Sequence, residues 1–321
     1  MRRRSRDARA LRRRRSERRR RHRDPLPAGK SEIIVTTTPR LAGAIHSLTW
    51  NGREFIDSAD HGRQLQSACA FDDGTPWDNS ETFNPTEAGS VRDGAGPTST
   101  SRLLHKVVGK DFLQTTVRMA YWLPPGMTSG GRPAKNTTAL SDHLLIKRVT
   151  VGDRGRPHVI RYRTTYVVPA GERHTFGQFE ALTGYMPFEF RKFYGLKPET
   201  GELEELTDGP GEQALPIVFA TADGGHAMGA IAEQPSAQGM SRIGYGRFAF
   251  ETEKVVKWNC AARLRVEKSD PPTTIAPGEY AFTTYVVVGD LETVHKTMRE
   301  LAQELAAPLS PTPRPNHGNQ P

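Results

Sequence analysis

Apolar and polar side chains alternate along most of the chain between residues 30 and 306. In the segment 158–168 (HVIRYRTTYVV), Ile160, Tyr162 and Tyr166 share one face, and the arginines between them point to the opposite face. A period of two predicts β-strands with one buried face. On the same grounds we expect strands at 33–38, 44–50, 64–71, 112–122, 142–151, 217–221, 228–233, 242–250, 255–267 and 281–288.

Turn residues separate nearly all of these segments. The clearest case is Asn51-Gly52, which lies between the alternating segment 44–50 and the apolar pair Phe55-Ile56. Both residues tolerate the positive φ angles of a type I′ turn, so we predict a tight β-hairpin there. Gly and Pro residues follow most of the other predicted strands, which is typical of antiparallel sheets.

One segment near the C-terminus has the period of a helix instead. Its apolar residues recur at spacings of three and four, at Leu291, Val294, Met298, Leu301 and Leu305. This spacing predicts an amphipathic helix with one apolar stripe. Asp290 is placed to cap its N-terminus, and Pro308 ends it.

Many long strands and a single helix imply two large sheets that pack on each other. We therefore predict an all-β fold, a two-sheet antiparallel β-supersandwich with a short C-terminal helix, over residues 30–306. A broad sheet bends, and its concave face forms a groove, where we expect the functional site. The Pro-rich end, 307–321, has no core-forming residues and is predicted to be disordered.

The net charge of +9 comes from the N-terminal segment. Fourteen arginines lie between Arg2 and Arg23, and three acids lie in the same segment, at positions 7, 17 and 24. The rest of the chain then has 31 of the 45 basic residues and 33 of the 36 acidic residues. The folded part is therefore nearly neutral. Only the Arg-rich tail 1–29, predicted to be disordered, is suited to bind nucleic acid. A second interpretation is that the tail results from a start codon placed too far upstream.

No targeting or membrane segment is recognisable. The basic tail is not followed by an apolar stretch of about 7–15 residues, so it is not a secretory signal. No apolar run of about 20 residues predicts a membrane span. The chain as written is expected to be soluble, cytoplasmic and without a membrane partner, and a secreted form is possible if the true start differs.

The long irregular segment 72–101 is the first candidate for a functional site. Loops of this length within a compact domain are uncommon, and they are usually functional or disordered. It contains Trp77, a flat apolar surface for a ligand, and Asn84, a directional polar group. Glu87 follows Pro85 in a stiff turn, which is how a general acid or base is positioned. A purely structural turn is an equal alternative.

A second cluster precedes the strand predicted at 64–71. Asp60 and His61 are candidates for proton transfer, and Arg63 for orienting a ligand. A polar surface turn is the alternative interpretation. The strand leads from this cluster into the loop that contains Glu87. We therefore expect His61 and Glu87 to act together as general acid and general base, with Asp60 as a further carboxylate.

Weaker candidates lie later in the chain. Glu180 is a possible second carboxylate, and Tyr185 a possible surface for stacking a sugar ring. Lys257 places a charge in a strand that otherwise looks buried, and Trp258 beside it is a second stacking candidate, although core packing is common for such residues.

No cofactor or metal ion is expected. The sequence has no Walker loop, no G-x-G-x-x-G after a strand, no G-x-S-x-G and no H-E-x-x-H. The acidic residues between 72 and 81 do not have the spacing of an EF-hand loop. Cys69 and Cys260 lie in apolar strands and do not form a Cys-x-x-Cys motif. We interpret them as buried thiols, and a single disulfide bond between them is the alternative.

Both ends of the predicted domain resemble a known family. The segment 42–56 (AGAIHSLTWNGREFI) resembles the opening hairpin of galactose mutarotase-like domains, and the segments 275–279 (IAPGE) and 285–289 (YVVVG) resemble their last strands. The resemblance implies a β-supersandwich with a sugar site on the concave face. Aldose 1-epimerases of this kind use a histidine, for which His143 and His174 are candidates, and a late glutamate, which the final strands here lack.

Three functional hypotheses follow. The first is a carbohydrate-active enzyme of epimerase, lyase or hydrolase type. It would act by acid/base proton transfer on a sugar or a saccharide that contains uronic acid, and its partner would be that saccharide. The second is a noncatalytic carbohydrate-binding domain. The third is an interaction protein whose Arg-rich tail binds nucleic acid.

Overall fold

The computed structural model describes residues 32–72, 81–266 and 274–306. The predicted tails 1–29 and 307–321 lie outside the described residues, as does Trp77. Among the described residues, no helix combines the length and the apolar character needed to cross a bilayer.

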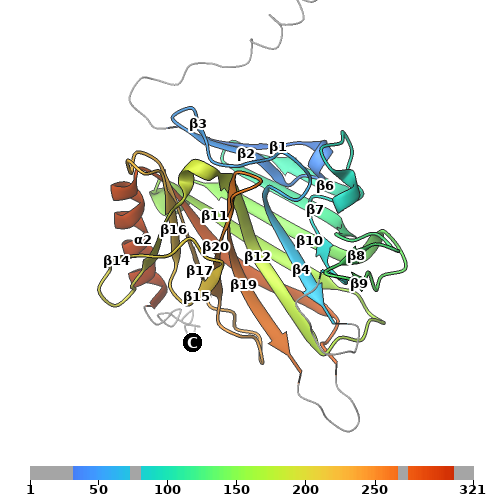
Figure 1. Ribbon diagram of the computed structural model, residues 1–321. Coiled ribbons are helices and arrows are strands. Elements are labelled where there is room, and N and C mark those ends of the chain that lie inside the picture. Colours follow the sequence, from blue (N-terminus) through green and yellow to red (C-terminus); the bar gives the residue numbers. More distant parts are fainter. Residues whose placement is uncertain (1–31, 73–80, 267–273, 307–321) are drawn as a thin grey trace, which may run out of the picture. The chain divides into compact units, whose positions relative to one another are not determined.

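The fold is all-β, as predicted, and its strands pair antiparallel in two layers (Figure 1). The strands of the first layer, in spatial order, are β6 (Arg102–Val108), β7 (Phe112–Tyr121), β10 (Leu140–Val151), β11 (Val159–Val168), β20 (Gly278–Gly289), β17 (Ala227–Ala232), β16 (Ile217–Ala220), β13 (Lys192–Leu196) and β14 (Leu203–Glu205). Those of the second layer are β5 (Pro85–Thr86), β4 (Leu65–Phe71), β12 (Phe176–Pro187), β19 (Val255–Arg265), β18 (Gly244–Phe250) and β15 (Gly211–Gln213).

A short pairing of β5 with β7 joins the two layers at one edge, so that one hydrogen-bonded sheet includes both layers. β2 (Ile45–Trp50) pairs with β4 of the second layer. β2 also pairs with β1 (Ile33–Thr37) and with β3 (Arg53–Glu54). The remaining short elements are the hairpin β8 (Thr128–Ser129) and β9 (Arg132–Pro133), and the 3-10 helices η1 (Pro39–Leu41), η2 (Val91–Asp93), η3 (Asp153–Gly155) and η4 (Phe188–Phe190).

The predicted hairpin and the predicted alternation are confirmed. Asn51 and Gly52 have φ angles of 51° and 79° between the paired strands β2 and β3. In β11 the side chains of Tyr162 and Tyr166 are fully buried between the layers. The Tyr166 hydroxyl group donates to the backbone carbonyl of Glu180 on β12 (2.6 Å), and so joins the first layer to the second.

The one α-helix of the described residues, α2 (Leu291–Ala306), covers the outer face of β17 and β20 (Figure 1). Its buried side chains are Val294, Met298, Leu301 and Ala302, which include three of the five predicted stripe positions. The Asp290 carboxylate accepts a hydrogen bond from the backbone N–H of Thr293 (2.7 Å), as expected of an N-cap.

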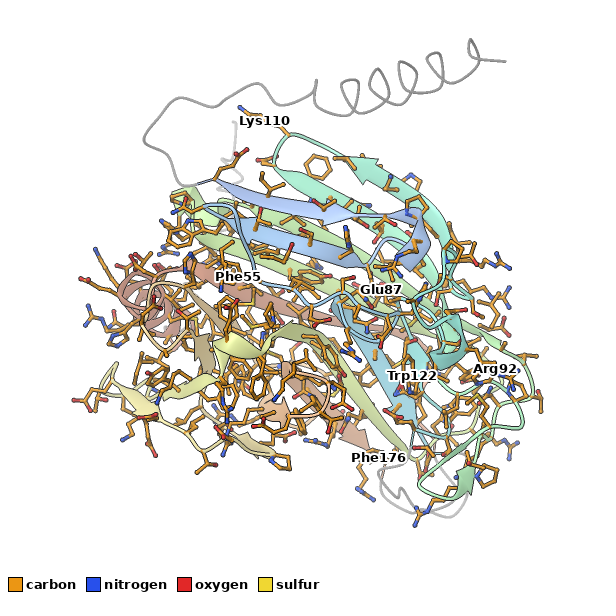
Figure 2. All side chains as sticks on the ribbon, turned by 45° about the horizontal axis from the view of Figure 1, so that its top comes forward. Phe55, Glu87, Arg92, Lys110, Trp122 and Phe176 are labelled. Atoms are coloured by element: carbon orange, nitrogen blue, oxygen red, sulfur yellow. The ribbon has the colours of Figure 1, made fainter. Side chains whose placement is uncertain are left out.

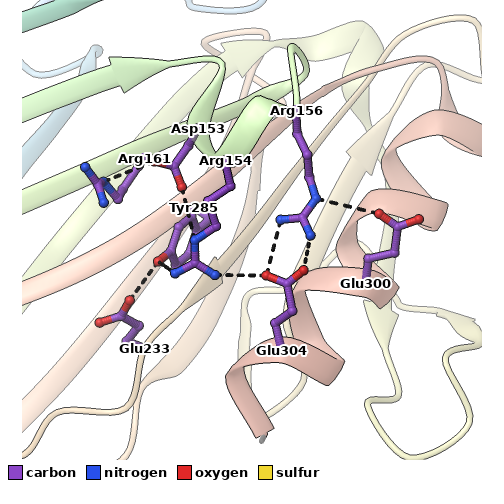
Figure 3. Close-up of polar contacts among 8 residues, drawn as sticks. All are labelled: Asp153, Arg154, Arg156, Arg161, Glu233, Tyr285, Glu300 and Glu304. Atoms are coloured by element: carbon purple, nitrogen blue, oxygen red, sulfur yellow. Dashed lines mark hydrogen bonds and ion pairs between the residues drawn. The ribbon is translucent and has the colours of Figure 1, made fainter. Parts of the chain in front are cut away.

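Ion pairs fix the far end of α2 to the loop before β11 (Figure 3). Arg154 Nη1 lies 2.9 Å from Glu304 Oε2, and Arg156 also pairs with Glu304. Arg156 Nε lies 3.7 Å from a carboxylate oxygen of Glu300 one turn earlier. These side chains are partly exposed, so most of the stability of the contact comes from the apolar stripe.

Cys69 on β4 and Cys260 on β19 are both buried and free. β12 lies between their two strands. β12 is also the largest departure from the predicted strands, because no strand is expected at 176–187 from the sequence pattern. It is central to the second layer, and it carries Glu180, Thr183 and Tyr185 of the site considered next.

Candidate functional site

A pocket of about 260 Å³ lies on the face of the second layer that is turned away from the interlayer core. The strands contribute side chains to it, including Gln66, Ala68, Thr86, Glu180, Thr183 and Lys257. The loops at its rim contribute Asp60, Gly62, Arg63, Glu81, Asn84 and Trp122. The aromatic side chains Tyr185 and Phe250 complete one wall, beside Glu253 and Val255.

Strand alternation decides which residues of β19 reach this pocket. Val255 and Lys257 line it, whereas Trp258 points to the opposite face and is 1% exposed in the core. Trp258 packs over Gly184, its register partner on β12: a Cβ atom at Gly184 would lie 2.5 Å from the indole. Successive side chains of a strand point to opposite faces, so Lys257 and Trp258 cannot serve the same site.

A β-bulge in β12 sets the positions of Glu180 and Thr183. The register with β19 shifts between Glu180 and Leu182, and the register with β4 shifts between Glu180 and Thr183. A bulge inserts one extra residue and changes which residues share a face. Glu180 and Thr183 therefore both line the pocket although they are three residues apart, and Tyr185 follows on the same face.

Glu180 and Lys257 form an ion pair in the pocket. Lys257 Nζ lies 3.4 Å from Glu180 Oε2, and the Thr183 hydroxyl donates to the same carboxylate oxygen at 2.5 Å. Burial by itself raises the pKa of Glu180, but the Lys257 ammonium and hydrogen bonds, including one from Asn259, outweigh burial and lower it. Burial by itself lowers the pKa of Lys257, but the Glu180 charge and hydrogen bond, together with the Tyr185 and Glu81 side chains, outweigh burial and raise it. Both groups are therefore charged near neutral pH.

The pKa of Glu81 shifts in the opposite direction from that of Glu180. The residue is exposed overall, but protein atoms desolvate its carboxyl group, and this desolvation raises its pKa. The Lys257 charge and a hydrogen bond from Trp122 act against the shift, and the Glu180 charge adds to it. The pocket thus holds two interacting carboxyl groups whose pKa values move apart.

Aromatic rings surround the Lys257 ammonium. Its Nζ lies 5.4 Å from the ring centroid of Tyr185 and 5.5 Å from that of Phe248. The ring of Phe250 is parallel to both, at 6.5 Å from Tyr185 and 6.2 Å from Phe248. Trp122, labelled in Figure 2, also lines the pocket and lies beside Gly62, where a Cβ atom would be 2.7 Å from the indole. The pocket therefore offers flat apolar surfaces from separate segments of the chain.

The loop before β4 supplies a second ion pair. Arg63 Nε lies 3.1 Å from Asp60 Oδ2, and both side chains are partly exposed. Gln66 holds this loop in place, because its amide nitrogen donates to the carbonyl of Gly62 at 2.9 Å. The backbone N–H of Trp122 donates a hydrogen bond to the backbone carbonyl of Asn84 (2.8 Å), and this bond joins two segments of the pocket rim.

His61 and Glu87 lie inside the protein and do not line the pocket. Both ring nitrogens of His61 contact backbone carbonyls, those of Gly94 at 2.6 Å and Arg40 at 2.9 Å. Glu87, labelled in Figure 2, is fully buried and pairs with the equally buried Lys147. The ring nitrogens of His61 and the carboxylate of Glu87 are thus engaged by other groups of the protein, and proton transfer to a ligand would require them to be free. These contacts give both residues a structural role.

The structure thus brings together six of the residues that sequence reasoning proposed for the site: Asp60, Arg63, Asn84, Glu180, Tyr185 and Lys257. Their chemical roles remain predictions. Trp258 packs in the core instead, and Trp77 lies outside the described residues.

Sequence reasoning missed Trp122 and Phe250, and it considered Glu81 only as a calcium ligand. Both aromatic residues end strands that the alternation predicts, but alternation alone does not say which face carries the site. Two sequence signals were available, the Trp at the end of the segment 112–122 and the paired aromatics Phe248 and Phe250 at a spacing of two.

The sequence matches no protein-family model and no curated protein. Several solved structures are similar in fold. A protein from Klebsiella pneumoniae named as an aldose 1-epimerase has a TM-score of 0.40 and 9% identity, over 88% of this chain and 86% of that one. It is of the kind that segments 42–56 and 285–289 resemble.

Two α-galactosidases are also similar. The enzyme from Lactobacillus brevis has a TM-score of 0.42 and 8% identity, over 83% of this chain and 39% of that one. The glycoside hydrolase family 36 enzyme from Geobacillus stearothermophilus has a TM-score of 0.41 and 10% identity, over 83% and 40%. The chain spans about two fifths of the length of these two enzymes, and the activities in the names belong to those proteins.

Proposed function

We propose that the pocket binds a saccharide and that Glu81 and Glu180 act on it as proton donor and proton acceptor. The observation that carries this proposal is the presence in one pocket of two interacting carboxyl groups, Glu180 with a lowered pKa and Glu81 with a raised pKa. Neighbouring carboxyl groups whose environments separate their pKa values are the arrangement used for acid/base catalysis.

The surfaces of the pocket support a sugar ligand. Trp122, Tyr185 and Phe250 provide apolar faces for the C–H groups of a sugar ring. Asn84 and Gln66 add hydrogen-bonding groups for hydroxyls. The volume lies near the lower end of small-molecule sites, roughly 300–1,000 Å³, which suits a single sugar ring.

The charges of the pocket favour a neutral sugar. Among the described residues that line it, four carry carboxyl groups and two are cations, Arg63 and Lys257. Each cation already has a carboxylate partner, Asp60 and Glu180 respectively. A uronic acid would add a further negative charge without a free cation to receive it, so we favour a neutral saccharide over an acidic one.

Paired variants test the proposal. Calorimetry against a panel of neutral and acidic monosaccharides and short oligosaccharides identifies the ligand, and NMR follows its epimerisation, elimination or hydrolysis. We expect Glu81→Gln and Glu180→Gln to lower turnover by about 10²–10⁴-fold while the dissociation constant changes only a few-fold. Glu204→Gln, an exposed carboxylate paired with Lys197, is the matched control and should change neither.

Three outcomes are informative. Saccharide binding without turnover would favour a noncatalytic binding domain. No binding by any saccharide would contradict the proposal. Nucleic-acid binding that is lost on deletion of residues 1–29 would favour the interaction protein.

A further inference from the structure

A second group of polar side chains lies outside the pocket. His143 comes from β10, and Glu172 and His174 come from the turn between β11 and β12. One ligand atom from each of the three lies within 4.8 Å of the others. His174 Nε2 is 2.8 Å and His143 Nε2 is 3.4 Å from the same oxygen, Glu172 Oε2. Both imidazole Nε2 atoms therefore converge on one carboxylate oxygen.

The ring nitrogens of His143 are buried and make no hydrogen bond within the described part of the chain. The residue is 1% exposed. Buried polar groups in proteins nearly always have a partner, so an unpaired imidazole that faces a carboxylate and a second imidazole indicates a missing ligand.

His174 has the hydrogen bond that orients a metal-binding histidine. Its Nδ1 contacts the backbone carbonyl of Asp72, and its Nε2 faces Glu172. A neutral ring has one N–H group, and the carbonyl can only accept, so the proton belongs on Nδ1. The Nε2 lone pair then faces the Glu172 carboxylate, and a cation between them removes the repulsion. A histidine ligand typically donates its other N–H group to an oxygen in this way.

Aromatic rings enclose the same three side chains. The ring of Phe71 lies 5.1 Å from that of His143 and 4.6 Å from that of His174, and Phe83 lies 5.1 Å from His174. The Glu172 side chain is 22% exposed and gives a route from solvent. An apolar surround with one polar entrance excludes competing water and strengthens a metal–ligand interaction.

We propose that His143, Glu172 and His174 bind one divalent transition-metal ion, with zinc the best match. Two imidazole nitrogens and one carboxylate oxygen are a known zinc-binding set that leaves a fourth position for water. Ligand atoms about 2.0–2.1 Å from a tetrahedral ion lie about 3.3 Å from one another. The His143–Glu172 distance of 3.4 Å already fits this value, and the His174–Glu172 distance needs to lengthen by about 0.5 Å.

The ion would connect β10 to the turn that begins β12. None of its three ligands lines the pocket, so the proposal does not depend on saccharide binding. It also differs from the expectation drawn from the sequence, in which no metal site is predicted, because the ligands are separated by a strand and a turn and form no local motif.

Zinc binding to the tag-free full chain tests the proposal. After treatment with a chelator and dialysis, we expect calorimetry to show one Zn²⁺ per chain and the melting temperature to rise with Zn²⁺. His143→Gln and Glu172→Gln should each weaken binding by more than about 100-fold and remove the Zn²⁺-dependent rise. His105→Gln, an exposed histidine on β6, should retain both. X-ray absorption of the zinc complex should show two imidazole ligands.

The opposite results are equally clear. Equal Zn²⁺ affinity in the wild type and in Glu172→Gln would overturn the proposal and place any bound metal elsewhere. No Zn²⁺ binding at all would also overturn it. If His143→Gln fails to fold, Glu172→Gln still decides, because its side chain is partly exposed and the substitution keeps its shape.

Discussion

Lys257 Nζ lies 3.4 Å from Glu180 Oε2, on neighbouring strands of the second layer. Their side chains are 16% and 19% exposed, so that little water screens the pair. The lysine lowers the pKa of Glu180 in a place where burial alone would raise it. The proposed proton acceptor therefore depends on a residue of a different strand.

Removing the lysine should reverse the pH dependence of stability. In the wild type the lowered pKa of Glu180 contributes stability above its unfolded pKa of about 4.3, and this contribution is lost as the pH falls through the folded value. In Lys257→Met, burial raises that pKa, so the variant should lose stability as the pH rises above about 4.3. The loss should be at most roughly 3–5 kcal/mol, since the pair is partly exposed.

Urea unfolding between pH 3 and pH 8 measures this difference. Lys192→Met, which breaks the exposed pair with Glu205, is the control and should change little at any pH. A Lys257→Met variant that follows the wild-type pH dependence would contradict the assigned role of Lys257.

The pH dependence of turnover should report both carboxyl groups. Once a substrate is known, kcat/KM should rise as Glu180 ionises below its ordinary pKa and fall as Glu81 loses its proton above the ordinary value of about 4.5. The optimum should therefore be acidic. Glu81→Gln should abolish the descending limb and leave the ascending limb in place, and a pH profile of this variant with both limbs intact would exclude Glu81 as the donor.

The buried pair of Glu87 and Lys147 should act on stability and not on the pocket. Both side chains are fully buried, and Lys147 Nζ also donates to the carbonyl of Gly43 at 2.9 Å. Glu87→Gln leaves the ammonium without its counter-charge and should destabilise the fold by roughly 3–5 kcal/mol. The double variant Glu87→Gln/Lys147→Met should recover part of this loss. Chemical denaturation measures both, and an unchanged midpoint for Glu87→Gln would contradict a structural role.

Gly184→Ala should destabilise the second layer through overpacking. The new Cβ atom would lie 2.5 Å from the Trp258 indole, which has no room to move in the core. We expect a loss of about 1–3 kcal/mol in the free energy of unfolding. In a Trp258→Leu background the same substitution should have almost no further effect, so a double-mutant cycle isolates the contact. Additive losses would show that the strain arises elsewhere.

The apolar contacts and the ion pairs of α2 should contribute very different amounts to the free energy of unfolding. Met298 is fully buried against β17, where Gly229 lies directly beneath it, and Met298→Ala should cost about 2–5 kcal/mol. Glu304→Ala removes the ion pairs with Arg154 and Arg156, which are partly exposed, and should cost less than about 1 kcal/mol. Thermal unfolding compares the two variants, and a larger effect of Glu304→Ala would mean that the ion pairs dominate.

Local patterns identified much of the fold in advance. The alternation in 158–168, the Asn51-Gly52 turn and the helix at 291–305 all correspond to elements of the structure. Each depends on residues that are near one another in sequence, so that backbone geometry alone relates them. The strand at 176–187 escaped prediction because its bulge after Glu180 interrupts the period of two, and because Gly177 and Gly184 weaken a strand pattern.

The sequence by itself determined the all-β class, the single helix and the supply of polar residues before and after the strand at 64–71. Only the tertiary structure decided which of those residues meet. The register of β12 with β19 placed Glu180 near Lys257 and sent Trp258 into the core, and the approach of β10 to the turn before β12 brought His143 to Glu172. Periodicity assigns a side chain to one of two faces, but long-range pairing and packing choose the face that is buried and the partners across it.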